Sequence, residues 1–589
     1  TTAHPDDEDG GLLTLEARGK GASVLLFTVT RGEGGQNKFG TESSDELGIL
    51  RTLELLEADK YYGVEQRFSH VTDFGFSKTA EETFNKWHGH DVALGDMVRA
   101  IRIFRPDILI ARFSGTPRDG HGHHQASALL TVEAFRAAGD PNKFPEQIKE
   151  GLLPWQAKKL YVGNPPGMFQ RNVAEQDYSV KLNIGEYSPI LGMSYTQFAL
   201  EGLAHQTSQG TGGIRVPPGP RYTYYQLKDS VLPKSDATHE AEFTDGIDTS
   251  IVGLAARLGP EESKASFLKP ALESLQKHVE EASKAFSMQD TSASAPPLLA
   301  GMSETAALLK QISSAQIAPA AKAELTTALE TKHQQFRDAA NEALGIYFDL
   351  SVDQPGGPGA PSYFPRMEQT ISLAVPGQTF TMTARLYNRG KLPIKTSDIT
   401  LALDPGWKSS VIKNDTHELA SGEISSVQFQ VTVPENAPYT RPYWSRGNPE
   451  TETIYTVSDP KLLTNPWPPY PVHAHASYML GNNSGEAAAV AKIKFVDPTS
   501  GQSERPLAVG PPISVLLNSP VVVAPVGGTE KSQIEVSVRS NIQTAVHAKL
   551  RLETPQGWKV EPDSIAVDLD HDGDVNNYAF QITPQNLHE

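Results

Sequence analysis

Apolar residues follow two different spacings in the N-terminal part of this chain. Residues 24–30 (VLLFTVT) and 107–111 (DILIA) are short, nearly continuous apolar runs, which is typical of buried strands. Residues 46–59 and 91–104 instead repeat apolar positions at helical spacing. This alternation predicts parallel strands joined by helices, with functional residues at the carboxyl ends of the strands.

The spacing changes in the middle of the chain and again after it. Residues 261–286 and 304–348 are rich in Ala, Leu, Lys and Glu at helical spacing, and they predict a helical hairpin or small bundle. The Pro- and Gly-rich residues 354–365 (QPGGPGAPSYFP) indicate a linker. Shorter segments with the spacing of β-strands follow.

A sequence repeat lies in this last part. The tripeptide GWK at 406–408 recurs at 557–559, and the dipeptide FQ at 429–430 recurs at 580–581. The offset is 151 residues in both cases. We therefore expect two copies of one β-sandwich, which resemble the immunoglobulin-like modules attached to bacterial carbohydrate enzymes.

Aromatic residues of this region have two expected roles. Trp407 and Trp558 occupy equivalent positions of the repeat and are expected in the sandwich cores. Trp444, Trp467 and Tyr470 lie in a Pro- and aromatic-rich insert between the copies, and they are candidates for stacking against sugar rings.

These patterns predict a multidomain protein of the α/β plus all-β class. The expected parts are an α/β domain (1–235), a helical segment (236–353), a linker (354–365), a first β-sandwich module (366–435), the insert (436–511) and a second β-sandwich module (512–589). The chain opens directly before its most informative motif, so we expect that a first strand, and any leader, is missing.

Composition excludes several classes of function. Lys and Arg number 52 against 70 Asp and Glu, for a net charge of −18, which argues against a nucleic-acid partner because phosphate binding needs a basic surface. No stretch approaches eighteen consecutive apolar residues, so no membrane span is expected. The absence of cysteine excludes disulfides and Cys-ligated metals. Zero cysteines and tandem sandwich modules favour a periplasmic or secreted bacterial protein.

Two polar clusters occupy places where strands should end. Residues 4–8 (HPDDE) form the first, and residues 119–125 (DGHGHHQ) open a helical run shortly after the strand at 107–111. The carboxyl ends of parallel strands meet at one edge of a sheet, so the clusters can converge. Together they offer the His and Asp ligands that zinc accepts.

Catalytic zinc takes three protein ligands and keeps a fourth position for water. Asp6 and Asp7 are neighbours that point in different directions, so one of these carboxylates stays free for proton transfer. His121 and His124 stand three residues apart and share a helix face. The positive helix N-terminus beside them favours a developing oxyanion.

Each cluster also has a structural interpretation. An isolated HPDD sequence is compatible with a turn capped by Asp, and histidines in a surface segment are often simply solvated. The pairing of both clusters at corresponding strand ends favours a site.

Four motifs in series carry a resemblance to a known family. They are residues 3–8 (AHPDDE), 30–35 (TRGEGG), 51–54 (RTLE) and 120–124 (GHGHH). In this order they resemble the PIG-L/LmbE-like zinc-dependent N-acetylglucosaminyl deacetylases. The resemblance covers roughly residues 1–230 and implies a Rossmann-like α/β deacetylase domain.

The resemblance also implies roles for individual residues. The implied zinc ligands are His4, Asp7 and His124. Asp6 becomes the general base, His121 stabilises the oxyanion and protonates the leaving amine, and Arg51 lies near the sugar. His123 departs from the pattern, since family members often have Asp there. Fe²⁺ and Co²⁺ suit the same ligands as Zn²⁺.

The expected function is a metal-dependent hydrolase that removes the N-acetyl group from an N-acetylglucosamine-containing substrate. A metal-activated water would attack with Asp6 as its base. Its partner would be an N-acetylated sugar or glycoconjugate. Two alternatives stay open: a zinc amidase of another N-acyl conjugate, and a catalytically silent carbohydrate-binding or cell-surface protein.

Overall fold

The computed structural model describes residues 1–163, 173–233, 238–355, 368–497, 501–518, 522 and 530–585. The chain forms two compact units, each built from two separate stretches of sequence. Unit 1 contains Thr1–Thr249 and Arg441–Pro468, and unit 2 contains Ser250–Thr440 and Pro469–Glu589. Most of the expected linker at 354–365 lies outside the described residues.

Unit 1 is an α/β domain. Its strands are β1 (Leu25–Thr28), β2 (Glu65–Phe68), β3 (Ile108–Ala111), β4 (Lys159–Gly163), β5 (Val180–Asn183), β6 (Tyr187–Ser188), β7 (Met193–Ser194), β8 (Tyr222–Ser230), β15 (Trp444–Ser445) and β16 (Thr456–Val457). Its α-helices are α1 (Gly10–Thr14), α2 (Asp45–Tyr62), α3 (Ala80–Lys86), α4 (Asp91–Phe104), α5 (Gly122–Ala137), α6 (Pro145–Lys149) and α7 (Tyr195–Leu203). Shorter helical turns are η1 (Leu15–Gly19), η2 (Pro117–Asp119), η3 (Glu175–Asp177), η4 (Thr207–Gln209), η5 (Thr211–Gly213) and η8 (Pro460–Leu462). The strands expected at 24–30 and 107–111 and the helices expected at 46–59 and 91–104 are confirmed.

The central strands of unit 1 are parallel, as the alternation predicts. β1 pairs with β2 and β3 pairs with β4 in parallel register, while β8 is antiparallel to β4 and β5. The first residues of the chain lie between β1 and β3: Thr2 forms a parallel bridge with Thr28, and the Arg112 amide donates to the Thr1 carbonyl. Residues 4–8 therefore begin at the carboxyl edge of this layer.

Helices cover both faces of the layer because successive strand residues point to opposite sides. Phe27 packs with Leu94 and Met97 of α4, whereas its neighbour Leu26 packs with Leu55 of α2. α2 ends at Gly63, whose φ of 82° is a left-handed conformation that favours glycine.

Residues 441–468 belong to unit 1, which corrects the expected boundaries of the insert. The amide of Thr72 donates to the Thr453 carbonyl at 2.9 Å, and the amide of Tyr455 donates to the His70 carbonyl at 2.8 Å. Val71 and Ile454 form an antiparallel bridge between these bonds. The segment thus pairs with the chain that continues from β2.

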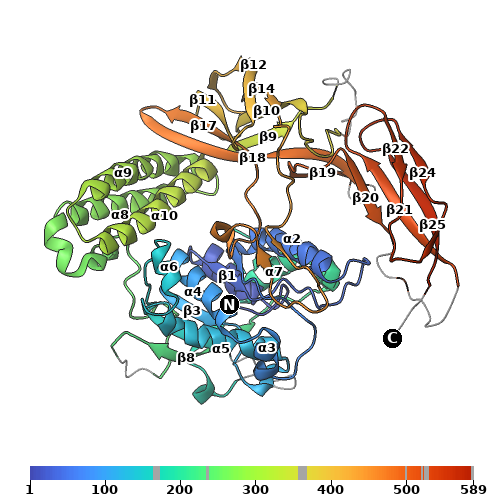
Figure 1. The fold of residues 1–589 in the computed structure, drawn as a ribbon. Coiled ribbons are helices and arrows are strands. Elements are labelled where there is room, and N and C mark those ends of the chain that lie inside the picture. Colours follow the sequence, from blue (N-terminus) through green and yellow to red (C-terminus); the bar gives the residue numbers. More distant parts are fainter. Residues whose placement is uncertain are drawn as a thin grey trace. The chain divides into compact units, whose positions relative to one another are not determined.

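Unit 2 begins with helices. Its α-helices are α8 (Leu268–Ala285), α9 (Ala295–Ser314) and α10 (Pro319–Leu344), with 3-10 segments η6 (Val252–Ala265) and η7 (Thr291–Ser294). Figure 1 shows α8, α9 and α10 side by side as a bundle. Leu272, Leu299 and Leu329 of the bundle share one buried core with Leu350 and Val431 of the neighbouring sheet. The helical segment is therefore confirmed, and its core is continuous with the β region.

The larger sheet of unit 2 has the strand order β12-β14-β10-β9-β18-β17-β11-β13, with β19 paired to β18. These strands are β9 (Ile346–Val352), β10 (Thr379–Asn388), β11 (Ile394–Leu403), β12 (Lys408–Asp415), β13 (Glu418–Leu419), β14 (Ile424–Thr432), β17 (Val472–Leu480), β18 (Asn483–Asp497) and β19 (Gly501–Pro506). β17, β18 and β19 fall within the expected insert, so residues 436–511 are not a separate part. Half of the buried positions of β17 and β18 are alanine, which is depleted in strands, so the sequence signal for these strands is weak.

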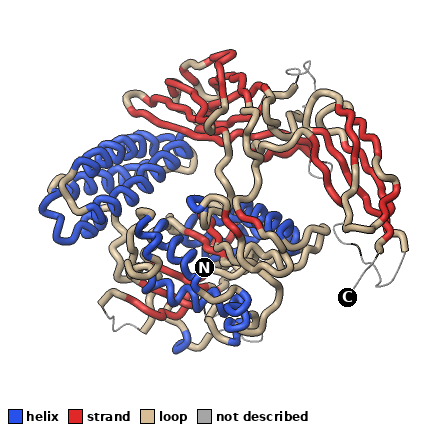
Figure 2. The backbone as a smooth tube through the Cα atoms, viewed as in Figure 1, coloured by secondary structure: helices blue, strands red, loops and turns tan. Residues whose placement is uncertain are grey.

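The last strands form a smaller β region with its own core. They are β20 (Ile513–Leu517), β21 (Ser532–Ser540), β22 (Val546–Leu550), β23 (Lys559–Glu561), β24 (Ile565–Leu569) and β25 (Val575–Thr583). Figure 2 shows the strands of unit 2 in red, distinct from its blue helices.

The repeat corresponds to equivalent strand pairs. Lys408 of β12 is paired with Thr432 of β14, and Lys559 of β23 is paired with Thr583 of β25. Trp407 is buried in the larger core, and Trp558 packs against the core of the smaller β region. The core position expected for Trp407 is confirmed, whereas Trp558 is partly buried at the margin of its core. The α/β plus all-β class is confirmed.

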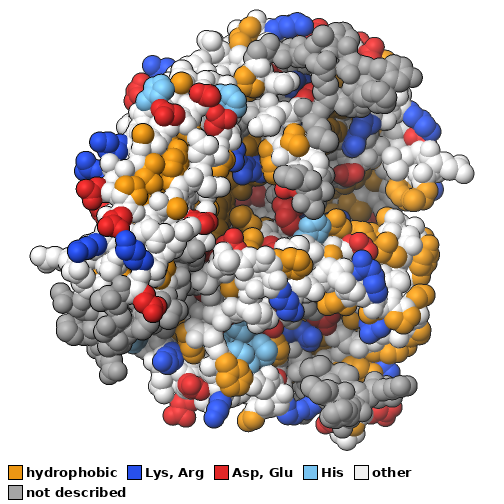
Figure 3. Space-filling model, turned by 90° about the vertical axis from the view of Figure 1, so that its right-hand side faces the viewer, with side chains coloured by type: hydrophobic (Ala, Val, Ile, Leu, Met, Phe, Trp, Pro, Cys, Tyr) orange, Lys and Arg blue, Asp and Glu red, His pale blue; other side chains and the backbone are white. Residues whose placement is uncertain are grey.

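Among the described residues, no helix has both the length and the apolar character that crossing a bilayer requires. Acidic, basic and apolar side chains are interspersed over the face drawn in Figure 3.

Candidate metal centre

The two polar clusters meet in unit 1, as their positions at strand ends predict. The ring centre of His4 lies 5.2 Å from that of His121 and 5.4 Å from that of His124. His4 follows the strand-like start of the chain, while His121 is the N-cap of α5 and His124 lies in its first turn. The start of the chain and the N-terminus of α5 therefore bring the two clusters together.

His4, Asp7 and His124 form one group that could hold a metal ion, with donor atoms within 4.8 Å of one another. His4 Nδ1 lies 2.9 Å from Asp7 Oδ2, and His124 Nε2 lies 3.3 Å from Asp7 Oδ1. Burial acts to raise the pKa of Asp7, but the two imidazoles outweigh it and hold this pKa well below its usual range. The group thus favours an ionised carboxylate between two histidines.

His124 is oriented by contacts on two sides. Its Nδ1 lies 3.1 Å from the Asp119 carbonyl oxygen, which can accept a hydrogen bond from a protonated Nδ1. Its ring stacks on Phe113 with a centroid distance of 4.0 Å and an interplanar angle of 5°. A carbonyl that takes the Nδ1 proton leaves Nε2 as the free donor atom, which is the usual arrangement of a metal-ligating histidine.

Asp6 lies apart from the metal-binding groups, although it adjoins Asp7. Its φ of 90° is rare for a residue other than glycine, and Asp6 is not a member of the ligand group. Asp6 Oδ1 accepts a hydrogen bond of 3.0 Å from Arg51, and the side chain is 30% exposed. Burial raises the pKa of Asp6, and the Arg51 charge opposes this rise. One carboxylate is therefore left outside the ligand group, as the sequence predicts.

Arg51 lies beneath the site and is only 4% exposed. Its guanidinium donates to the Gly32 carbonyl at 3.0 Å, to the Pro5 carbonyl and to Asp6. A Cβ at Gly32 would clash with this guanidinium, so the Gly-rich loop needs glycine here. Arg51 thus positions Asp6, and its contact with a sugar stays a prediction.

His121 is arranged as a neutral hydrogen-bond donor. Its Nδ1 accepts from the backbone amide of His123 at 3.1 Å, which places the proton of the neutral ring on Nε2. Burial, together with the positive charges of His4 and His124, lowers the pKa of His121 to about 4.

His123 is the least expected residue of the centre. It is 1% exposed, and within the described residues neither of its ring nitrogens has a hydrogen-bond partner. Burial lowers the pKa of His123 well below its usual range. With His4 and His121 it forms a second group whose donor atoms lie within 4.8 Å of one another.

Sequence reasoning missed one acidic residue near His4, Asp73. Asp73 Oδ2 lies 3.8 Å from His4 Nε2, and the Asp73 amide donates to Glu33 Oε2 at 3.0 Å. Burial raises the pKa of Glu33, and the neighbouring Tyr455 opposes this rise. Asp73 follows β2 at the same sheet edge as the clusters, and this position is the signal that could have identified it.

Glu8 and Asp9 are hydrogen bonded within the protein and belong to neither group of possible metal ligands. Glu8 Oε1 accepts from the Tyr62 hydroxyl at 2.9 Å and from Gln206 at 2.7 Å, while Asp9 caps α1 and accepts from Thr223. Burial raises the pKa of Glu8 to about 7.

Trp444 is not a sugar-stacking platform. It is 5% exposed, and the Arg31 guanidinium lies over its ring at 3.4 Å from the centroid. Trp467 packs beside it with ring centroids 5.7 Å apart. The aromatic side chains of 441–468 therefore hold this segment in unit 1.

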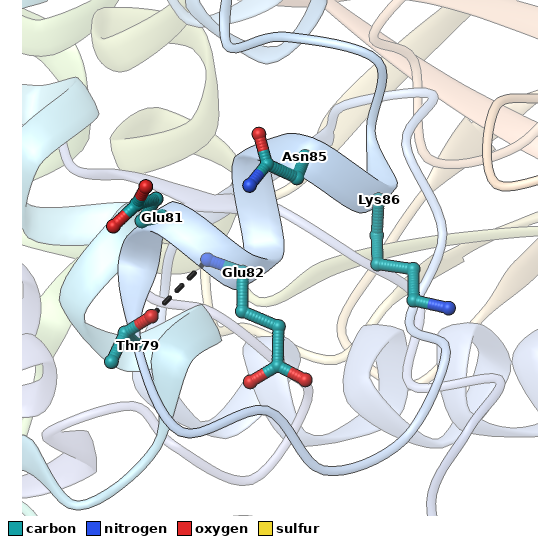
Figure 4. Close-up of a pocket in the computed structure, with 5 residues that line it drawn as sticks. All are labelled: Thr79, Glu81, Glu82, Asn85 and Lys86. Atoms are coloured by element: carbon teal, nitrogen blue, oxygen red, sulfur yellow. Dashed lines mark hydrogen bonds between the residues drawn. The ribbon is translucent and has the colours of Figure 1, made fainter.

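A surface hollow beside α3 is separate from the metal centre (Figure 4). Its lining residues are Thr79, Glu81, Glu82, Asn85 and Lys86. None of the predicted ligands lines it, and Thr79 serves there as the N-cap of α3 by accepting from the Glu82 amide.

Two family models match the chain. Residues 1–135 match PIG-L, described as GlcNAc-PI de-N-acetylase. Residues 374–443 match the NPCBM-associated, NEW3 domain of alpha-galactosidase.

Individual relatives match the N-terminal part. The chain is 30% identical over 199 residues to a mycothiol S-conjugate amidase of Streptomyces coelicolor, a match that covers 32% of this chain and 66% of that protein. It is 29% identical over 170 residues to a diacetylchitobiose deacetylase of Thermococcus kodakarensis, covering 28% and 60%. The chain thus spans 66% and 60% of the lengths of these relatives.

Among solved structures, the N,N'-diacetylchitobiose deacetylase from Pyrococcus horikoshii is similar at 16% identity and a TM-score of 0.28, covering 41% of this chain and 86% of that one. The family models agree with the motifs read from the sequence. Residues 1–135 therefore form a PIG-L domain, and residues 374–443 form a NEW3 domain.

Proposed function

We propose that this protein is a metal-dependent hydrolase that removes the N-acetyl group from an N-acetylglucosamine-containing substrate. One observation carries the proposal: His4, Asp7 and His124 bring three donor atoms together, while the partly exposed Asp6 lies beside them outside the group. The names of the two curated relatives, an amidase and a deacetylase, support amide hydrolysis.

The residues of the centre fit a divalent cation. Two imidazoles and one carboxylate are a ligand set that catalytic zinc uses, and Fe²⁺ and Co²⁺ accept it as well. His4 Nε2 is buried without a hydrogen-bond partner among the described residues, as expected where a cation completes the environment. When bound, such a cation lowers the pKa of a water molecule and polarises the acetyl carbonyl.

Asp6 is the general base of this proposal. The hydrogen bonds of the described residues engage its Oδ1 through Arg51, so Oδ2 is the oxygen that takes the proton of the attacking water. General-base catalysis typically contributes about a hundredfold to ten-thousandfold in rate.

His121 acts on the opposite side of the amide. Its Nε2–H donates a hydrogen bond to the oxygen of the acetyl group as negative charge develops there, and the proton that Asp6 takes from the water passes to the leaving amine. The His123 amide maintains this tautomer by donating to His121 Nδ1.

Acetate release from N-acetylated sugars tests the proposal. Asp6→Asn should bind zinc nearly normally and lose at least about a hundredfold in turnover. Asp91→Asn is a matched control, because the Asp91 side chain is 82% exposed. Wild-type turnover by the Asp6→Asn variant would show that Asp6 is not the base.

A second candidate is an amidase of another N-acyl conjugate. The 30% identity to a mycothiol S-conjugate amidase favours it. A screen of acetyl and longer acyl amides on free, oligomeric and lipid-linked amino sugars separates the two, because a deacetylase should prefer acetyl. A catalytically silent protein would release no acetate with added zinc.

A further inference from the structure

His123 is a buried imidazole that the proposed reaction does not use. It lies in the first turn of α5, with ring centres 4.5 Å from Phe74 and 5.3 Å from Trp87. Neither of its nitrogens has a hydrogen-bond partner within the described part of the chain, and the residue is 1% exposed. Burying an imidazole whose two nitrogens lack hydrogen-bond partners is costly. A ligand that bound one of these nitrogens would reduce this cost.

His123 adjoins two other histidines. Its ring centre lies 4.8 Å from that of His121 and 5.2 Å from that of His4. One donor atom from each of these three residues lies within 4.8 Å of the other two. These residues therefore make a second set of three imidazole donors. His121 Nε2 joins it when its proton moves to Nδ1, which breaks the hydrogen bond from the His123 amide.

His4 belongs to both sets, and its two nitrogens have different surroundings. Nδ1 lies 2.9 Å from Asp7 Oδ2, whereas Nε2 has no hydrogen-bond partner among the described residues. When Nδ1–H donates to Asp7, the lone pair of Nε2 is free to bind a cation. A carboxylate that orients a histidine in this way is the common outer partner of a metal-ligating imidazole.

We propose that His4, His121 and His123 form an alternative, all-histidine position for a divalent cation, beside the His4, Asp7 and His124 set. Nitrogen-only ligands favour late first-row ions such as Cu²⁺, Ni²⁺ and Zn²⁺. One ion occupies either position but not both, because a neutral His4 has only one free lone pair.

Occupation of the all-histidine position has a consequence for the site. An ion there occupies His121 Nε2 and removes the donor that faces the acetyl oxygen, so excess Cu²⁺ or Ni²⁺ should inhibit hydrolysis. Only this consequence rests on the proposed function. The binding position itself can be tested without substrate.

Copper binding by the metal-free full-length chain tests the proposal, with equilibrium dialysis for affinity and electron paramagnetic resonance for the number of nitrogen ligands. His124→Ala removes a ligand of the first set and leaves the all-histidine set intact. We expect this variant to bind one Cu²⁺ with the signature of three nitrogens. Combining it with His123→Phe, a ring of similar size among aromatic neighbours, should weaken binding at least tenfold.

Two further variants complete the experiment. His124→Ala with His123→Asn repeats the test with a polar side chain, in case phenylalanine disturbs folding. His124→Ala with His547→Ala is the matched control, because the His547 side chain is 78% exposed and lies in unit 2.

Equally weak Cu²⁺ binding by the His124→Ala variant and both His123 double variants would overturn the proposal, as would a three-nitrogen signal that survives loss of His123. Neither result bears on hydrolysis, which the Asp6→Asn comparison tests independently.

Discussion

The Arg31 guanidinium lies 3.4 Å from the ring centre of Trp444, although these residues are 413 positions apart in the sequence. Arg31 also lies over Phe68 at 4.3 Å and donates to the carbonyls of Asn465 and Pro466. It is 2% exposed. A late segment of the chain is therefore fastened to the Gly-rich loop of the PIG-L domain.

Acidic residues connect this segment to the candidate metal centre. The Tyr455 hydroxyl donates to Asp45 at 3.0 Å, and Tyr455 also interacts electrostatically with Glu33. Glu33 accepts from the amide of Asp73, whose carboxylate lies 3.8 Å from His4. Residues 441–468 thus hold the loops that surround His4.

Trp444→Ala should destabilise unit 1. The substitution removes a buried indole and uncovers Arg31, and Trp→Ala changes in cores cost about 3–5 kcal/mol. Thermal unfolding followed by circular dichroism should show an early transition, accompanied by release of bound zinc. Phe286→Ala is the control, since Phe286 is 48% exposed. Unchanged unfolding of the Trp444 variant would show that the segment is not needed for the stability of unit 1.

Arg51→Lys should lower kcat more than it changes KM. Lysine cannot reproduce the separate bonds to Gly32 and Asp6, so the base would lose its position. We expect kcat to fall about tenfold to a hundredfold, as for other residues that orient a site. Steady-state kinetics of acetate release measure both constants. A raised KM with unchanged kcat would instead support the predicted contact with the sugar.

Asp73→Asn should weaken zinc binding about tenfold to a hundredfold, the usual effect of removing an outer carboxylate. The amide of asparagine keeps the size of the side chain but removes the charge near His4. Competition with a zinc chelator measures the affinity, with Asp91→Asn as control. Wild-type affinity would place Asp73 outside the metal's surroundings.

His70 should make the stability of unit 1 depend on pH. Burial opposes protonation of His70, but the hydrogen bond and charge of Asp96, 2.6 Å from Nδ1, raise the pKa of His70. The His70–Asp96 interaction therefore adds its full share to the stability of unit 1 below about pH 6.5, the pKa of a histidine in the unfolded chain. This share is lost as the pH rises through the higher pKa of His70 in the folded protein. A hydrogen bond to a charged group is worth about 1.5–3 kcal/mol.

His70→Asn tests this dependence, since asparagine can donate to Asp96 without titrating. Melting temperatures of both proteins between pH 5.5 and 9 should differ most at low pH and converge at high pH. A constant difference across this range would assign the effect to packing rather than to protonation.

Much of the architecture follows from local pattern. The apolar runs at 24–30 and 107–111 and the helical spacing at 91–104 specify β1, β3 and α4, because strand and helix periods are set by neighbouring residues. Strand-end positions likewise suffice to bring residues 4–8 and 119–125 together, since parallel strands share one carboxyl edge.

Tertiary packing decided what local pattern does not encode. Residues 441–468 join unit 1 through the burial of Arg31 and Trp444, and β18 joins a sheet with strands from before it in the chain. The burial of His123 likewise depends on Phe74 and Trp87, which come from other parts of the fold. Such contacts depend on which distant surfaces exclude water together, and spacing along the sequence carries no record of that choice.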